Sequence, residues 1–109
     1  STLAGARLQG ATLAQADLSE ANLSNAILHN ADLRHTLAVR TLFNNAQFFH
    51  ANLAEAVLKN ADLRGSNFQA ANLYGCDLSR IYKDEQTVWN DANLDRAKTK
   101  PERKETADS

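Results

Sequence analysis

Large and small apolar residues recur every five positions along most of the chain. Divided into fives from residue 1, the sequence gives sixteen consecutive units that end at Arg80. The third position is Leu or Phe in fifteen of the sixteen units, the exception being Ala38, and the first position is always Ala, Ser, Thr or Cys. The other three positions carry most of the polar residues and glycines. A pattern this regular predicts one repetitive structure.

A period of five fits neither an α-helix nor a straight strand. On an α-helix, five residues advance about 140° beyond a full turn, so successive leucines would scatter around the axis. In a strand the side chains alternate between faces, so an odd period would place successive leucines on opposite faces. Both problems disappear if each unit is a short extended segment followed by a corner, because the corner returns the first and third positions to the interior. The sequence therefore predicts a coil.

The units also resemble a known family. ADLSE, ANLSN, ADLRH, ANLAE and ADLRG match the A(D/N)LXX motif of the pentapeptide-repeat proteins, which are abundant in cyanobacteria, and the match spans about three quarters of the chain. This resemblance implies an all-β fold, a right-handed quadrilateral β-helix with four pentapeptides per coil. Residues 1–80 would then form about four coils and a pentapeptide-repeat solenoid domain. The central residues would stack inward in four ladders: Leu3, Leu23, Phe43, Leu63; Leu8, Leu28, Phe48, Phe68; Leu13, Leu33, Leu53, Leu73; and Leu18, Ala38, Leu58, Leu78.

The five-residue rhythm changes after the sixteenth unit. Lys83 stands where a Leu is due, and the rhythm resumes one residue late, with Trp89 and Leu94 at the centres. An open β-helix end exposes apolar side chains and unpaired backbone groups, which solenoids protect with caps. We predict that residues 81–97 form a C-terminal cap in which Trp89 covers the open coil.

Three further expectations concern the ends of the chain. Asp91 is an N-cap residue type, so a short helix through Lys98 is expected. The stretch 98–109 is charged and nearly free of apolar residues, and we predict that it is disordered. No cap pattern precedes the first coil, so upstream repeats or a second copy of the chain are expected to cover it.

Charge and cysteine content exclude several classes of protein. Twelve Lys and Arg residues against thirteen Asp and Glu residues leave no strong field to attract nucleic acid or an anionic membrane. No apolar run approaches the length of a membrane span. Cys76 is the one cysteine, which excludes an internal disulfide, and its first-position place predicts a buried, inert thiol. The compartment is left open.

No catalytic, cofactor or metal site is predicted, because a filled rod has no concave pocket in which reactive groups converge. His29, His35 and His50 fall at outward positions, where solvated side chains are favoured over metal ligands. The second position carries several acids, for which the favoured role is a hydrogen bond to the local backbone at the corner. These acids are Asp17, Asp32, Asp62 and Asp77.

The segment HTLAVRTLFNN, residues 35–45, interrupts the pattern. Leu37, Val39 and Leu42 stand where polar residues are usual, and Ala38 stands where a Leu is due. If the register is kept, these three residues and Val57 form an exposed apolar patch that could bind a partner. Alternatively, a bulge shifts the chain so that Leu37 or Val39 turns inward and fills the space beside Ala38. The sequence leaves both interpretations open.

These observations favour a non-enzymatic interaction module that presents flat solenoid faces to an unknown protein partner, with no nucleic acid or membrane. A homodimer through an exposed coil end or through the apolar patch is a further expectation. The alternative is a DNA mimic that inhibits an enzyme such as gyrase, as in the quinolone-resistance members of the family. Mimicry requires a strongly negative surface, but the sixteen units hold six acids and six bases. The chain could also be one domain of a larger protein.

Overall fold

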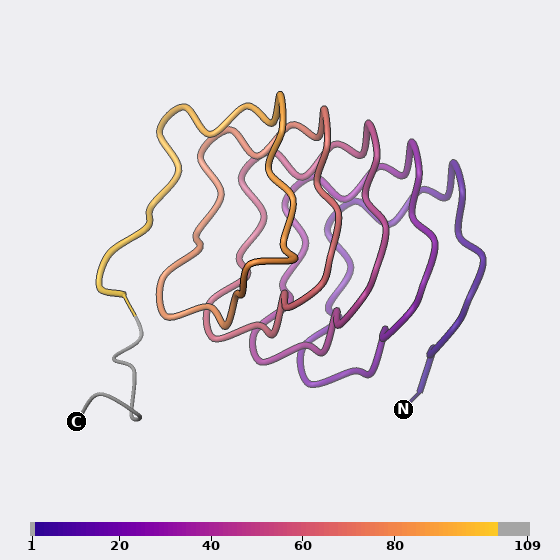
Figure 1. Cartoon of the computed structure of the whole chain (residues 1–109). Helices are drawn as coiled ribbons and strands as arrows, with labels where there is room; N and C mark the ends of the chain where they lie inside the picture. The colour runs from indigo at the N-terminus through magenta and orange to yellow at the C-terminus, as the bar shows by residue number, and fades with distance from the viewer. Residues whose placement is uncertain (1, 103–109) are drawn as a thin grey trace.

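The computed structural model describes residues 2–102, and the chain winds through them as a stack of similar coils (Figure 1). Parallel bridges join each second-position residue to the residue twenty positions later, from Thr2 and Asn22 through Asp62 and Tyr82. Four turns separate successive rungs of the same ladder. The predicted twenty-residue coil is therefore confirmed. We number the coils from the N-terminus as residues 2–20, 21–40, 41–60, 61–80 and 81–101.

Backbone pairing between coils is regular but very short. Residues 2–102 contain no helix and no continuous strand, only isolated bridge residues separated by turns. Around Leu42, for example, the carbonyl accepts a hydrogen bond from the Leu23 N–H (2.7 Å) and the N–H donates to the carbonyl of Ala21 (3.0 Å). Because the same pattern recurs at each rung, the ladders run along the axis of the solenoid although no single segment is a strand.

Each corner of the regular units through Arg80 is a turn whose last residue before the next unit lies in the left-handed region. At the corner after Phe43, the Ala46 N–H donates to the Phe43 carbonyl (3.0 Å), and Asn45 has a φ of 60°. A positive φ at this place is the mark of a type II turn, which favours Gly and Asn. Glu55 nevertheless adopts a φ of 61°, a conformation that costs a non-glycine residue about 1–2 kcal/mol. Its N–H donates to the carbonyl of Tyr74 on the next coil (2.7 Å), so neighbouring coils hold the corner in place.

The core consists of the third-position side chains and the small residues beside them. In coils 2–4 every third-position side chain is at most 3% exposed, which confirms the predicted inward ladders there. In coil 1, Leu3 is 40% exposed, because this coil has a described neighbour on one side only. The buried large residues are Leu23, Leu28, Leu33, Phe43, Phe48, Leu53, Leu58, Leu63, Phe68, Leu73 and Leu78.

The interrupted segment keeps the register, so no bulge forms. Leu37 is bridged to Asp17 on one side and to Val57 on the other, twenty residues away in each direction. Ala38 points inward and is fully buried, whereas Leu37 is 46% exposed. Of the two interpretations that the sequence left open, the structure adopts the one that leaves the leucine outside.

Two threonines occupy the interior positions beside Ala38. Thr36 and Thr41 are the first-position residues before and after it, and both are buried. Their hydroxyls are satisfied, because Thr36 donates to the Leu33 carbonyl (3.0 Å) and Thr41 to the Leu18 carbonyl (2.7 Å). Relative to alanines, the two threonines together add at least as many non-hydrogen atoms as a leucine at 38 would. The threonines thus supply buried atoms in place of those that a leucine at 38 would add, and the chain keeps its register.

Residues 81–101 continue the path as a fifth coil that is one residue longer. The bridge from Asn67 reaches Val88, a separation of 21 residues, where all earlier bridges span twenty. Asp84 lies in the corner that contains the additional residue. Its side chain accepts the Gly65 N–H (3.0 Å), whereas the corresponding N–H at other corners donates to a backbone carbonyl. Thr87 donates its hydroxyl hydrogen to the Leu63 carbonyl (2.9 Å). Polar side chains therefore complete the pairing where the longer corner disturbs the backbone ladder.

Trp89 lies over the C-terminal end of the aromatic column inside the solenoid. Its ring stacks on Phe68 with centroids 5.0 Å apart and an interplanar angle of 6°, and Phe68 stacks in turn on Phe48 at 4.4 Å. Trp89 is half-buried, whereas Leu94, the next centre along the chain, is 40% exposed. The indole is thus the large apolar group that shields the end of the fourth coil.

The expectation of a helix from Asp91 to Lys98 is wrong. Asp91 is the left-handed corner residue of a turn (φ 60°), and Lys98 forms a bridge with Asp77. The boundary at which the tail was expected to begin also lies too early, because the Pro101 carbonyl accepts the Arg80 N–H (2.9 Å). Backbone groups of coil 4 pair with these residues whatever their side chains. Residues 103–109 of the predicted tail lie outside the described residues.

Substitution of Ala38 by leucine tests whether the threonines fill the space beside it. We expect Ala38→Leu to lower the free energy of unfolding by about 1–3 kcal/mol, because the core is already full. Adding Thr36→Ala and Thr41→Ala should recover part of that loss by making room. Urea denaturation followed by circular dichroism measures both effects, and stabilisation by Ala38→Leu alone would show that a void exists there.

Removal of the Trp89 ring tests its shielding role. We expect Trp89→Ala to lower the free energy of unfolding by about 2–3 kcal/mol, less than for a fully buried aromatic residue because one side of the ring meets solvent. Trp89→Phe should retain most of the stability, and Leu94→Ala serves as the control at an exposed centre. Equal losses for Trp89→Ala and Leu94→Ala in thermal melts would contradict a special role for the indole.

Candidate binding surface

Four apolar side chains lie outside the core at adjoining positions of coils 2 and 3, and we call them the apolar patch: Leu37, Val39, Leu42 and Val57. Leu37 and Val57 are successive rungs of one ladder, and Leu42 lies around the corner that follows Val39. Leu37 and Leu42 are 46% and 40% exposed, and the two valines are half-buried. The structure thus places all four predicted residues on the outside.

The leucines of the patch give up a hydrogen bond that the repeat normally makes. At second positions that carry Asp or Asn, the side chain accepts the N–H two residues on, as when Asn22 Oδ1 accepts from Ser24 (3.0 Å). The predicted corner bonds form at all four acids, to the residue two positions later. Leu37 cannot accept such a bond, and the Val39 N–H donates instead to Ser19 Oγ on the coil before (3.2 Å). A leucine at this position therefore contributes no corner hydrogen bond to the fold.

Charged residues border the apolar patch on several sides. Arg40, at the corner between Val39 and Leu42, pairs with Glu20 on the preceding coil (3.0 Å). Lys59 lies two residues beyond Val57 and is exposed. Asp17 occupies the rung before Leu37, and the Ser19 N–H that it accepts is the main cause of the lowered pKa of its carboxyl.

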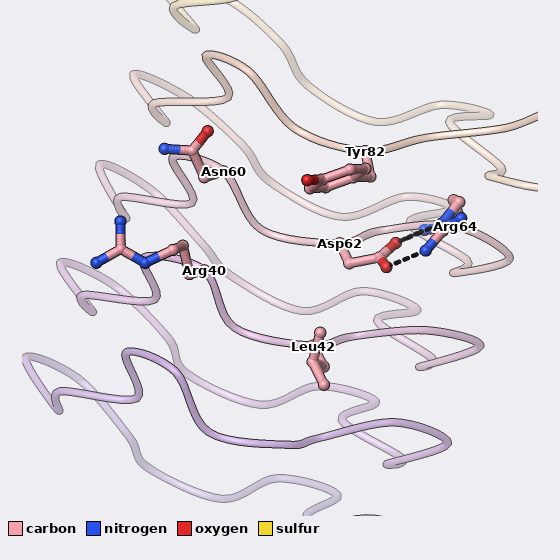
Figure 2. Close-up of a pocket in the computed structure, with 6 residues that line it drawn as sticks. All are labelled: Arg40, Leu42, Asn60, Asp62, Arg64 and Tyr82. Atoms are coloured by element: carbon pink, nitrogen blue, oxygen red, sulfur yellow. Dashed lines mark hydrogen bonds and ion pairs between the residues drawn. The ribbon is translucent and has the colours of Figure 1, made fainter. Parts of the chain in front are cut away.

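An open concavity of about 560 Å³ adjoins the apolar patch. Leu42, Asp62 and Tyr82 lie one above another on successive coils, and Arg64 stands to one side of them in Figure 2. On the other side, the lining is completed by corner residues Arg40 and Asn60. The concavity therefore has an aliphatic group at one end, an aromatic ring at the other, and polar groups between and beside them.

The carboxylate in the concavity is held by an internal ion pair. Asp62 is 6% exposed, and Arg64 donates to both of its oxygens, with Nε 2.9 Å from Oδ1. Burial alone would raise the pKa of Asp62, but hydrogen bonds from Arg64 and Asn44 outweigh it and lower that pKa. The Arg64 guanidinium also lies 5.5 Å from the centre of the Tyr82 ring. A neutralised, low-pKa carboxylate is suited to fixing the shape of a surface rather than to accepting a proton in catalysis.

The sequence reasoning did not identify Arg64 and Tyr82 as parts of this surface. For Arg64 a signal existed, since the unit ADLR places Asp and Arg on the same outward side two residues apart. The same unit at Asp32 forms an equivalent pair, and hydrogen bonds from Arg34 lower the pKa of Asp32 to about 2. Tyr82 lies beyond the regular units, so only the three-dimensional stacking places it above Asp62.

The other candidate groups are not brought together. His35 lies 3.4 Å from Glu55, and His29 bonds Gln47 (3.3 Å), whereas His50 packs on Phe49. Among residues 2–102, no three His, Cys, Asp or Glu side chains gather as a metal site. In the same part of the chain, no helix has the length and apolar character to span a membrane.

The single cysteine is shielded from solvent. Cys76 is fully buried, and burial raises the pKa of its thiol. A protonated, inaccessible thiol does not act as a nucleophile.

Neutralising Asp62 tests the ion pair in the concavity. Because the folded-state pKa of Asp62 is lowered, its stabilising contribution is present above the unfolded value of about 3.9 and is lost as the pH falls through the folded value. We therefore expect Asp62→Asn to be less stable than the wild type by up to about 1 kcal/mol at pH 7, since Arg64 is half-exposed. The difference should shrink towards pH 2 in urea titrations. Arg64→Gln should show the same convergence, and a difference independent of pH would contradict the assignment.

Comparisons with known proteins agree with the fold. The family model described as pentapeptide repeats matches this chain in eight copies, over residues 1–37 and 41–80. A pentapeptide repeat protein from the Arabidopsis thaliana thylakoid lumen is 26% identical with a TM-score of 0.67; the match covers 88% of this chain and 63% of that protein. A pentapeptide repeat protein from Nostoc is 27% identical with a TM-score of 0.68, and the match covers 80% of this chain and 83% of that one.

More distant matches add little. The plasmid-mediated fluoroquinolone resistance protein QnrB1 is 16% identical with a TM-score of 0.51, over 92% of this chain and 64% of that one, a likeness of fold alone. The comparison with curated protein sequences found no match. No catalytic family is indicated by any of these matches. The family model is interrupted at residues 38–40, which include Val39 of the apolar patch. Because it matches more than half of the chain, this chain belongs to the pentapeptide-repeat family.

Proposed function

We propose that this chain is a non-enzymatic protein-binding module that presents the apolar patch and the adjoining concavity to a protein partner. Its scaffold is taken to be the right-handed quadrilateral β-helix of the pentapeptide-repeat family, with the regular coils as one domain and the residues after 80 as its C-terminal cap. The observation that carries the proposal is Leu37, which is 46% exposed at a position where the repeat has polar alternatives.

The scaffold suits recognition because it is preorganised. Each coil is bonded to its neighbours at every rung and every corner, and the interior is filled by buried Leu, Phe and Ala side chains. Exposed side chains on such a scaffold lose little freedom when a partner binds, since the backbone beneath them is already fixed. Adjacent exposed apolar residues at positions where the repeat also uses polar residues support a partner contact.

The chemistry of the surface supports binding over catalysis. The carboxylate in the concavity is paired with Arg64, and the thiol of Cys76 is buried. Equal numbers of acids and bases in the sixteen units favour a protein partner over mimicry of DNA, whose charge is uniformly negative.

Restoring the polar residue of the repeat tests the proposal without disturbing the fold. Leu37→Asn combined with Val57→Asn should abolish most partner binding, by at least about tenfold, because it removes the apolar centre of the surface. Asparagine already occupies this position elsewhere in the chain and accepts the corner hydrogen bond. The matched control is Ile27→Asn, a second-position substitution two corners away on the same solenoid.

Affinity capture from extracts of the source organism, with the captured protein then purified and titrated, measures the effect. We expect the wild type and Ile27→Asn to bind with affinities within about twofold of each other. Partners that bind the patch variant as tightly as the wild type would contradict the use of this surface.

A further inference from the structure

One outward column of the solenoid has acids at both ends and apolar residues in the middle. Successive rungs of this ladder are Asp17, Leu37, Val57 and Asp77, joined by parallel bridges at intervals of twenty residues. With about 4.8 Å between rungs, the two carboxylates lie roughly 14 Å apart along the axis, with the apolar pair between them. One outer face of the solenoid thus carries a line of four side chains in the order acid, apolar, apolar, acid.

The two acids are held by the backbone rather than by cations. Asp17 Oδ1 accepts the Ser19 N–H (3.0 Å), and Asp77 Oδ1 accepts the Ser79 N–H (3.0 Å) and hydroxyl (2.7 Å). Among the described residues, neither forms an ion pair, in contrast to Asp32 and Asp62 elsewhere. The corner hydrogen bonds fix the positions of the two carboxylates, and a cationic group of a binding partner could pair with each of them.

The spacing of the column selects a helix rather than a strand. On an α-helix the residues i, i+4, i+7 and i+11 share one face, and they rise by about 6, 10.5 and 16.5 Å from the first. The rungs lie at about 4.8, 9.6 and 14.4 Å, so the helix stays within about 2 Å of them. Alternate residues of an extended strand advance about 6.8 Å, and the mismatch would grow to roughly 6 Å at the last rung.

From this column we infer that the partner of the proposed binding surface is an amphipathic α-helix lying along the solenoid axis, with Lys or Arg at i and i+11 and aliphatic residues at i+4 and i+7. The basic side chains reach Asp17 and Asp77, and the aliphatic pair covers Leu37 and Val57. Lys59, beside Val57 and in no ion pair with another described residue, favours an acid on the flank of the helix that faces the corner. This inference rests on the proposed function.

A second copy of the chain fits the column less well. If two copies met face to face through this column with their axes parallel, each acid would meet its own equivalent. With antiparallel axes Asp17 would face Asp77. Both arrangements oppose like charges at the two ends, whereas a helix with basic ends opposes unlike charges.

A synthetic helix tests the inference directly. The probe is a fluorescein-labelled, stapled peptide of about 18 residues with Arg at i and i+11, Leu at i+4 and i+7, and Ala, Gln or Glu elsewhere. We expect saturable binding to the wild-type protein in fluorescence anisotropy. Replacing both Arg residues by Glu should weaken binding by about tenfold, because each end changes from attraction to repulsion. Raising the salt concentration should reduce the difference between the two peptides.

Matched variants of the protein separate the charge contribution from the apolar one. Asp17→Asn with Asp77→Asn retains the acceptors for the corner bonds and should remove the preference for the Arg peptide. Asp32→Asn, on another face, should leave it unchanged. Leu37→Asn with Val57→Asn should weaken both peptides alike.

The other possible outcomes distinguish failure of the helix inference from failure of the proposed function. Equal binding of the Arg and Glu peptides, or no binding of either, overturns the helix inference. If the natural partner still depends on Leu37 and Val57 in that case, the proposed function stands. If a dimer forms by sedimentation, disappears in the Leu37→Asn and Val57→Asn variant, and is not displaced by the peptide, the occupant is a second copy. If neither capture nor peptide binding depends on the patch, both proposals fall.

Discussion

The hydrogen bonds between successive coils are the interaction on which the rest of this structure depends. Each five-residue unit is too short to be stable alone, and its corner places a residue at positive φ, which is unfavourable for Glu55 or His35. The N–H of such a residue donates to the coil above, so the neighbour stabilises the corner. The same spacing brings third-position side chains into contact, as in the stacked rings of Phe48 and Phe68. Corner, rung and core therefore stabilise one another, and each coil depends on its neighbours.

Part of this architecture could be predicted from the five-residue period, and part only from the resemblance to the pentapeptide-repeat family. The period alone places positions one and three inward, and the turn chemistry of Asp predicts the corner bonds of the acids. The stacking of the third positions in ladders twenty residues apart followed from the resemblance. The register around Ala38 could not be decided in this way, because a void and a bulge are both physically reasonable. Thr36 and Thr41 held the relevant signal, since two larger residues flank the one small centre. Trp89 at the end of the aromatic column followed from the late resumption of the rhythm.

The errors came from local signals that non-local pairing overrides. Asp91 has the side chain of a helix N-cap, but its neighbours Asn90 and Asn93 bond to the backbone of coil 4, and Asp91 becomes another corner. Lys98 is polar and follows no apolar pattern, yet it bridges Asp77 because pairing along the ladder uses backbone atoms only. The stacking of Tyr82 above Asp62 was missed for a related reason. It depends on the fifth coil continuing the path, which no pattern within residues 81–86 indicates.

The longer corner at Asp84 shows that a coil can gain a residue at an outer corner without losing its core contacts. One extra residue is accommodated there, the offset of the next bridge grows to 21, and Trp89 still reaches Phe68. The side chains of Asp84 and Thr87 take over bonds that the backbone would have made, so the disturbance ends within a single turn. A corner of this kind is a natural place to graft a foreign loop or a label. An insertion at this corner would lie on the outside of the solenoid and leave the packing of the core unchanged.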